Sequence, residues 1–413
     1  MTPAPAPRRR SWPVIAAVLA CAAGCGGTLP PASTATTSPA AASTGAATLP
    51  SPTLNPATSA PSASAGLELE LHALPESVSR AVGPSVASDG QELVWAVASG
   101  VGTATALADL ASFTPGRDAA PAVFYRHPDR DSMIWDVAVR DGACAFLEMN
   151  ERKLGENGWR LWSLPARRGK AVLLDTRDGS PTDGRPAAMF ALTRDGIVWS
   201  AVHDHEGTPT FELLTARLDG SGRRVLLSAP VKTRQFWYPS ADPSGASVLY
   251  ATVEPAGGGF EYRLWSLDLE DPAAQPVRLG ASDTATQPVT NGSTLVWRTV
   301  DGNGGNWSPS LTAAARDGGA PVTVPVDRLL RLTVGNRFAA FDTEATQSVE
   351  LYDLSTGRLV DVERYTPPDT RGVQPGWTVV AGDLLVFRRV DYYNADGASA
   401  APPAIVWASL PPG

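Results

Sequence analysis

Residues 235–279 read QFWYPSADPSGASVLYATVEPAGGGFEYRLWSLDLEDPAAQPVRL, and this stretch decides the fold. Its apolar or alternating segments are rich in aromatic and β-branched residues, and short runs of Gly, Pro, Asp and Ser separate them. Such segments are typical of short strands joined by turns. The stretch predicts a four-stranded antiparallel sheet with strands at Gln235–Tyr238, Ser247–Ala251, Tyr262–Leu269 and Gln275–Leu279.

The same unit recurs along the chain as a turn followed by a strand that ends in an aromatic residue. Turn pairs such as Asp141-Gly142 and Asn291-Gly292 favour tight hairpins in which both central residues have positive φ. A repeat of about 40–50 residues with strand-like content is typical of a β-propeller. We therefore expect an all-β, seven-bladed β-propeller whose blade cores hold the recurring aromatic residues, which are Trp95, Phe146, Trp199, Tyr250, Trp297, Phe341 and Phe387.

The last blade supplies only three of its own strands before the chain ends at Gly413. Near the other end, Leu67-Glu68-Leu69-Glu70-Leu71 alternates apolar and acidic residues. Because a propeller closes its ring and exposed edge strands promote aggregation, we expect residues 67–72 to form the fourth strand of blade 7.

The N-terminus has the features of an export signal. Three arginines at 8–10 precede a short apolar run, and Cys21 and Cys25 follow at once. The run is too short to span a membrane. These residues resemble the signal peptides of bacterial lipoproteins, in which the cysteine becomes lipid-modified; the alternative is an ordinary secretory signal. The resemblance implies a signal peptide at 1–20, or 1–24 if Cys25 is the modified residue.

Residues 26–66 contain no charged residue and consist almost entirely of Ala, Ser, Thr, Pro and Gly. Such a composition cannot bury a core and predicts a disordered tether at 21–66, followed by the propeller at 67–413. We expect a protein anchored in the cell membrane by its lipid and facing the extracytoplasmic side, so that its first partner is the lipid bilayer.

Charge, sequence motifs and cysteine content restrict the classes of function that the chain could have. The formal charge is −8, and removing the three arginines at 8–10 leaves 31 basic against 42 acidic residues, or −11. An acidic chain without a basic cluster is a poor nucleic-acid binder. We find no sequence motif for a cofactor, a P-loop or a nucleophile elbow. The one cysteine in the predicted propeller, Cys144, is expected to be a buried apolar residue.

The repeats resemble the TolB-type, WD-repeat-like propellers of bacterial envelopes. Blade 4 carries the likeness best, with Trp237-Tyr238-Pro239, Asp242-Pro-Ser-Gly245 and Leu264-Trp-Ser-Leu-Asp268. The resemblance covers residues 67–413 and is specific for fold rather than function. The tether occupies the place of the extra α/β domain of TolB, so a role in the Tol–Pal system is not supported.

The sharpest candidate site is His203-Asp204-His205-Glu206, in a predicted long loop at 203–210. Imidazole and carboxylate groups bind Zn²⁺ and similar ions, so His203 and His205 are candidate metal ligands. Two residues at this spacing need a third ligand from elsewhere, for which His127 and His72 are available. The alternative is a solvated polar turn.

Two further loops carry candidate ligand-binding residues. Asp301 and Asn303 lie in a glycine-rich segment that could hold Ca²⁺ or be a plain hairpin loop. Trp307, Tyr392 and Tyr393 could stack on a sugar or anchor a protein partner.

The sequence favours a non-enzymatic binding or protein-interaction module of the cell envelope, with an envelope protein, a cell-wall glycan or a solute as partner. The alternative is a carbohydrate-active hydrolase or lyase, with or without a metal. Its site would lie on the face of the long loops between repeats, near the central channel, because binding residues concentrate on loops over rigid scaffolds.

Overall fold

A computed structural model describes residues 67–74, 82–97, 107–129, 132–149, 158–166, 169–179, 186–300, 310–326, 329–343, 348–363, 372–392 and 404–413. All of them belong to one unit, Ala63–Gly413. The described residues form strands and turns only, and none of them lies in a helix that could cross a membrane.

The strands form seven antiparallel four-stranded sheets, which confirms the predicted propeller. Blades 1 to 4 comprise β2 (Val82–Ser88), β3 (Leu93–Val97), β4 (Asp109–Phe113), β5 (Ala122–Arg126); β6 (Met133–Arg140), β7 (Ala143–Met149), β8 (Trp159–Leu164), β9 (Val172–Arg177); β10 (Met189–Leu192), β11 (Gly196–His205), β12 (Thr208–Arg217), β13 (Arg224–Pro230); and β14 (Gln235–Ala241), β15 (Ser247–Ala256), β16 (Gly259–Asp268), β17 (Val277–Leu279).

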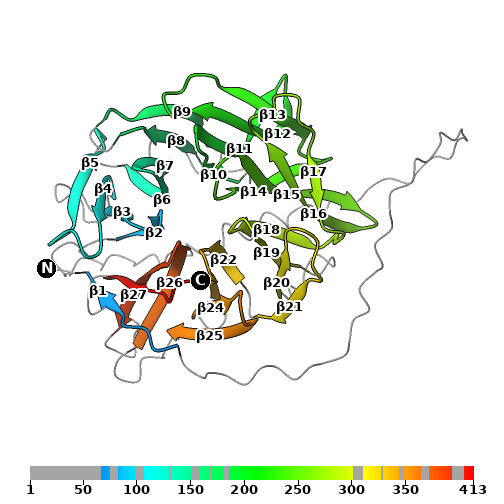
Figure 1. Cartoon of the computed structure of the whole chain (residues 1–413). Coiled ribbons are helices and arrows are strands. Elements are labelled where there is room, and N and C mark those ends of the chain that lie inside the picture. Colours follow the sequence, from blue (N-terminus) through cyan, green and yellow to red (C-terminus); the bar gives the residue numbers. More distant parts are fainter. Residues whose placement is uncertain are drawn as a thin grey trace, which may run out of the picture. The chain divides into compact units, whose positions relative to one another are not determined.

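Blades 5 to 7 comprise β18 (Ala285–Thr290), β19 (Thr294–Thr299), β20 (Ser310–Ala315), β21 (Val322–Pro325); β22 (Leu329–Val334), β23 (Phe338–Thr343), β24 (Val349–Asp353), β25 (Arg358–Glu363); and β26 (Gly372–Ala381), β27 (Leu384–Tyr392), β28 (Ala404–Ser409) with β1 (His72–Ala73). The first strand of each blade contacts the first strand of the next, and β26 contacts β2, so the ring is closed. Figure 1 shows the blades arranged in a ring, with the first strand of each blade innermost.

Blade 7 is completed from the N-terminal side, as predicted, but by fewer residues. Strand β1 pairs antiparallel with β28 through His72↔Trp407 and Ala73↔Val406. The predicted strand at 67–72 is therefore wrong in extent. The alternating leucines at 67–71 instead pack on the core between blades 6 and 7, while Glu68 and Glu70 are exposed. The alternation reports side-chain packing there rather than a hydrogen-bonded ladder.

The recurring aromatic residues lie in cores between neighbouring blades. Trp199, for example, is fully buried among Leu161 and Leu174 of blade 2 and Leu214 of blade 3. Burying one such side chain contributes about 1.5–3 kcal/mol. The aromatic repeat is thus structural, as predicted, and Cys144 is buried as expected.

The turns differ from the prediction in two ways. Of the Asp-Gly and Asn-Gly pairs that the structure describes, only Asp141-Gly142 has positive φ at both residues (49° and 77°). At Asn291 the side-chain Oδ1 instead accepts the backbone N–H groups of Ser293 and Thr294, an Asx turn that needs no positive φ before the glycine. The predicted long loop at 203–210 is also wrong, because β11 and β12 continue to a two-residue turn at Glu206-Gly207 (φ 52° and 80°).

Candidate functional site

Strand β11 carries a face that begins in the core and ends in solvent. Trp199 and Ala201 pack against blade 2, and His203 and His205 continue the same face because side chains alternate along a strand. Exposure of the side chain rises to 20% at His203 and 57% at His205. The two histidines thus extend a blade interface out to the surface.

The carboxylate of Asp175 on β9 of blade 2 meets this face at its buried end. It accepts hydrogen bonds from the Trp199 indole Nε1 at 2.7 Å and lies 3.1 Å from His203 Nε2. The Arg223 guanidinium, in the turn between β12 and β13, lies 3.1 Å from Oδ1 and 5.6 Å over the Trp199 ring. Three donors from blade 3 therefore converge on one buried acid of blade 2.

The carboxylate of Glu212 on β12 links the two histidines. Its Oε2 lies 2.8 Å from His203 Nδ1, and its Oε1 lies 3.0 Å from His205 Nε2. Glu212 and Asp175 are both buried, at 7% and 5% side-chain exposure. Asp175, His203, Glu212 and His205 thus form a chain of alternating acid and base, which with Arg223 we call the blade 2–3 cluster.

The electrostatics of the blade 2–3 cluster favour a charged His203. Both of its ring nitrogens face carboxylates, so both act as donors, as only the imidazolium can. The hydrogen bond to Asp175 raises the pKa of His203 against the opposing effect of burial. Burial alone would raise the pKa of Asp175, but its bonds with His203 and Trp199 and the charge of Arg223 lower it.

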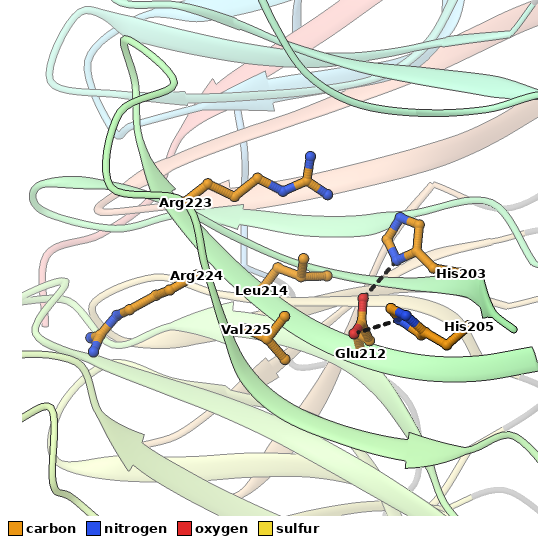
Figure 2. A pocket seen from close by; sticks show the side chains of 7 residues that line it. All are labelled: His203, His205, Glu212, Leu214, Arg223, Arg224 and Val225. Atoms are coloured by element: carbon orange, nitrogen blue, oxygen red, sulfur yellow. Dashed lines mark hydrogen bonds and ion pairs between the residues drawn. The ribbon is translucent and has the colours of Figure 1, made fainter.

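The exposed end of the blade 2–3 cluster opens into a surface depression of about 460 Å³, which is within the usual size of small-molecule sites. Figure 2 shows both histidines directed at Glu212, with Leu214 and Val225 forming an apolar floor beside them. Arg223 extends toward the side of His203, whereas Arg224 extends away from it. The lining comes from β11, β12, β13 and the turn before β13, and no residue of the inner strand β10 lines it, so the depression lies away from the predicted place near the channel.

The structure places His203 and His205, the predicted metal ligands, in contact with one carboxylate, that of Glu212. No group of three or more His, Cys, Asp or Glu residues suited to a metal ion is found in the part of the chain that the structure describes. His127, considered as a third ligand, faces Glu148 at the blade 1–2 interface. His72 stacks on Trp407 at the ring closure, with centroids 4.4 Å apart.

The other predicted site residues are not placed by the structure. Tyr392 is the last residue of β27, paired with Gly372, and its side chain is not described. The remaining candidates fall outside the described residues: Asp301, Asn303, Trp307, Tyr393, Cys21 and Cys25.

Sequence reasoning missed Asp175, Glu212 and Arg223. Glu212 had a signal, because it shares the strand phase of the buried Leu214 and an acid in that phase must find a partner. Asp175 and Arg223 had none, since their contacts depend on how blade 2 packs on blade 3.

Comparisons with known proteins bear on the fold. No family profile matches the chain, and no curated protein does. Among solved structures, a prolyl endopeptidase matches with a TM-score of 0.53 and 16% identity, over 78% of this chain and 48% of that one. This chain therefore spans about half the length of that enzyme.

Two further structures are matched over nearly their whole length. An oligogalacturonate lyase in complex with manganese has a TM-score of 0.51 and 13% identity, over 84% of this chain and 97% of that one. The β-propeller domain of the Trilobed protease from Pyrococcus furiosus has a TM-score of 0.52 and 8% identity, over 79% and 95%. Identities this low show a shared propeller fold and no more.

Proposed function

We propose that this chain is a lipid-anchored, extracytoplasmic propeller that acts as a binding module at the cell envelope, with the depression at the blade 2–3 cluster as its binding surface. The observation that carries the proposal is the preorganisation of that surface. Its polar side chains are held by one another, from two blades, beside an apolar floor. Groups fixed before binding lose little entropy when a ligand arrives.

The N-terminal sequence supports the anchoring part of the proposal. In cells, the wild-type protein should fractionate with membranes, and the double variant Cys21→Ser/Cys25→Ser should be released into the soluble extracytoplasmic fraction. The single variants identify the modified cysteine, since only one of them should release the protein. Membrane attachment of the double variant at the wild-type level would refute the anchor.

The binding surface can be tested with a photoreactive residue at Val225, which lines the depression. Val277 is the matched control: it is also an exposed valine on an outermost strand, in the next blade, and it does not line the depression. We expect the probe at 225 to crosslink an envelope component that the probe at 277 does not capture. Equal crosslinking from both positions, or none from 225, would contradict the assigned surface.

One observation favours a second function, a carbohydrate-active lyase or hydrolase. Glu212 holds His205 by Nε2, and a carboxylate behind an imidazole orients it as a general base or metal ligand. One of the structures that share the fold is an oligogalacturonate lyase with manganese. Cleavage of acidic polysaccharide by the wild type, with or without added Mn²⁺, and its loss in His205→Gln would establish the enzyme; turnover unaffected by that change would exclude this site.

A further inference from the structure

The outward-facing polar groups of the depression are a guanidinium and an imidazole, whereas the acids of the cluster are buried. The Arg223 and His205 side chains are 44% and 57% exposed, and Asp175 and Glu212 are 5% and 7% exposed. This arrangement is the reverse of the protein as a whole, which has a formal charge of −8. An approaching ligand therefore meets positive and N–H-bearing groups in an otherwise acidic protein.

The two acids are also occupied. Both oxygens of Glu212 bond to histidines, and Asp175 is bonded to Trp199, His203 and Arg223. Their negative charge is offset by His203 and Arg223 within about 3 Å, so it repels an incoming anion weakly.

Both exposed groups retain a nitrogen for a ligand. Among the described residues, Arg223 contacts Asp175 and the Leu174 carbonyl through its two terminal nitrogens, which leaves the Nε–H to donate. Within the same residues, His205 contacts Glu212 through Nε2, which leaves Nδ1 to accept. Guanidinium groups recognise carboxylates with several parallel N–H bonds, so a partly exposed and fixed arginine is suited to that task.

The floor of the depression adds an apolar element. Leu214 and Val225 are direct cross-strand partners at the point where a bulge shifts the register of β12 against β13. Val225 is 48% exposed. A ligand that fits must combine an anionic group, which can contact Arg223, with an apolar face that can lie on Leu214 and Val225.

We infer that the depression binds a carboxylate-bearing saccharide unit, with its carboxylate on Arg223, a hydroxyl group donating to His205 Nδ1, and the apolar face of its ring on Val225 and Leu214. The inference rests on the proposed function and names its ligand class. A volume of about 460 Å³ suits a sugar unit or two rather than a folded partner. Asp175 and Glu212 act as positioning residues, because they hold Arg223 and His205 in place.

The test is calorimetric titration of the full-length protein with a hyaluronan tetrasaccharide, which carries glucuronate, and with neutral cellotetraose. We expect the acidic sugar to bind at least about tenfold more tightly, and Arg223→Gln and His205→Gln each to weaken it about tenfold. Arg223→Lys should recover part of the affinity. Arg278→Gln, at a partly exposed arginine on the outer strand of blade 4, is the control and should bind as the wild type does.

Several results would overturn the inference. Equal affinity for the two sugars, or wild-type affinity in both Gln variants, would remove the carboxylate contact. A hexaglutamate peptide binding as tightly as the tetrasaccharide would remove the saccharide assignment. Melting temperatures of the variants separate lost binding from lost folding. If the probe at position 225 crosslinks an envelope component but the protein binds acidic and neutral sugars equally, the ligand class is wrong and the proposed binding surface still stands.

Discussion

Two successive blade interfaces hold the same set of groups in opposite settings. At the blade 1–2 interface, Glu148 accepts from the Trp162 indole at 2.8 Å and faces His127 at 3.5 Å and Arg160 at 3.8 Å. In the blade 2–3 cluster, Asp175 meets an indole, an imidazole and a guanidinium in the same way. We call the first set the blade 1–2 cluster.

The difference lies in what the second nitrogen of each histidine contacts. His127 Nδ1 accepts from the backbone N–H of Asp129, and the His127 and Glu148 side chains are only 3% and 0% exposed. His203 Nδ1 contacts Glu212, and the other oxygen of Glu212 contacts the exposed His205. One extra acid and one extra base therefore extend the blade 2–3 cluster to the surface, whereas His127 and Glu148 of the blade 1–2 cluster stay buried.

The largest expected effect comes from removing the acid of the blade 1–2 cluster. Glu148→Ala leaves the Trp162 indole N–H without its acceptor and removes the carboxylate that faces His127 and Arg160 in a buried place. The free energy of unfolding should fall by about 3–5 kcal/mol, measured by urea denaturation. Glu68→Gln, at an exposed position, is the control and should change it by less than about 0.5 kcal/mol. A loss below about 1 kcal/mol would mean that this interface does not depend on the ion pair.

The blade 1–2 cluster also predicts a pH dependence at acid pH. Burial opposes ionisation of Glu148, but bonds with His127 and Trp162 lower its pKa from 4.5 to about 2. A depressed folded-state pKa stabilises the native state above pH 4.5, and this contribution is lost as the pH falls through the interval down to about 2. The shift corresponds to about 3 kcal/mol. Glu148→Gln should lack this part of the acid-induced loss, which denaturation at pH 5 and pH 2.5 would show.

A smaller effect is expected at the blade 2–3 cluster, where water reaches part of the site. Asp175→Asn keeps an acceptor for Trp199 but removes the negative charge that faces His203 and Arg223, and should cost about 2 kcal/mol at pH 6. Because the pKa of His203 is raised above 6.5, its contribution is complete below pH 6.5 and is lost as the pH rises through the folded-state pKa. Urea denaturation at pH 6 and pH 9 should show the wild type and the variant drawing closer at pH 9. A constant gap would mean that His203 is not charged at pH 6.

The sequence predicted the scaffold far better than the site, for a physical reason. The core of each blade repeats the same pattern, so Trp199 and its six aromatic counterparts mark the equivalent strand in all seven blades. That a segment before blade 1 closes the ring was predictable because a blade with three strands needs a fourth, but the paired residues, His72–Ala73, were not. These features follow from local pattern and from the closure of a ring.

The blade 2–3 cluster does not follow from that repeated pattern. His203 and His205 were predicted as a pair, but in a loop, because the sequence around Glu206-Gly207 does not reveal that both strands run up to a two-residue turn. The pairing of Asp175 with His203 spans 28 residues and two sheets, so no local spacing encodes it. Contacts between side chains of different blades can be identified only when the packing of those blades is known.

The smallest expected effect on stability distinguishes the two histidines at the ends of the clusters. His205→Ala removes a half-exposed ring whose one hydrogen bond within the described residues is with Glu212, and it should lower the free energy of unfolding by no more than about 0.5 kcal/mol. His127→Ala removes a buried ring packed edge-on against Trp162 and Phe146, and should cost about 2–4 kcal/mol because it leaves a cavity beside a buried acid that has lost one of its partners. Thermal and urea unfolding of both variants, with binding of the hyaluronan tetrasaccharide measured in parallel, would show that His127→Ala loses stability and that His205→Ala loses affinity for the sugar. If His205→Ala destabilises the ring as much as His127→Ala does, the exposed end of the blade 2–3 cluster is structural and the depression is not a ligand site.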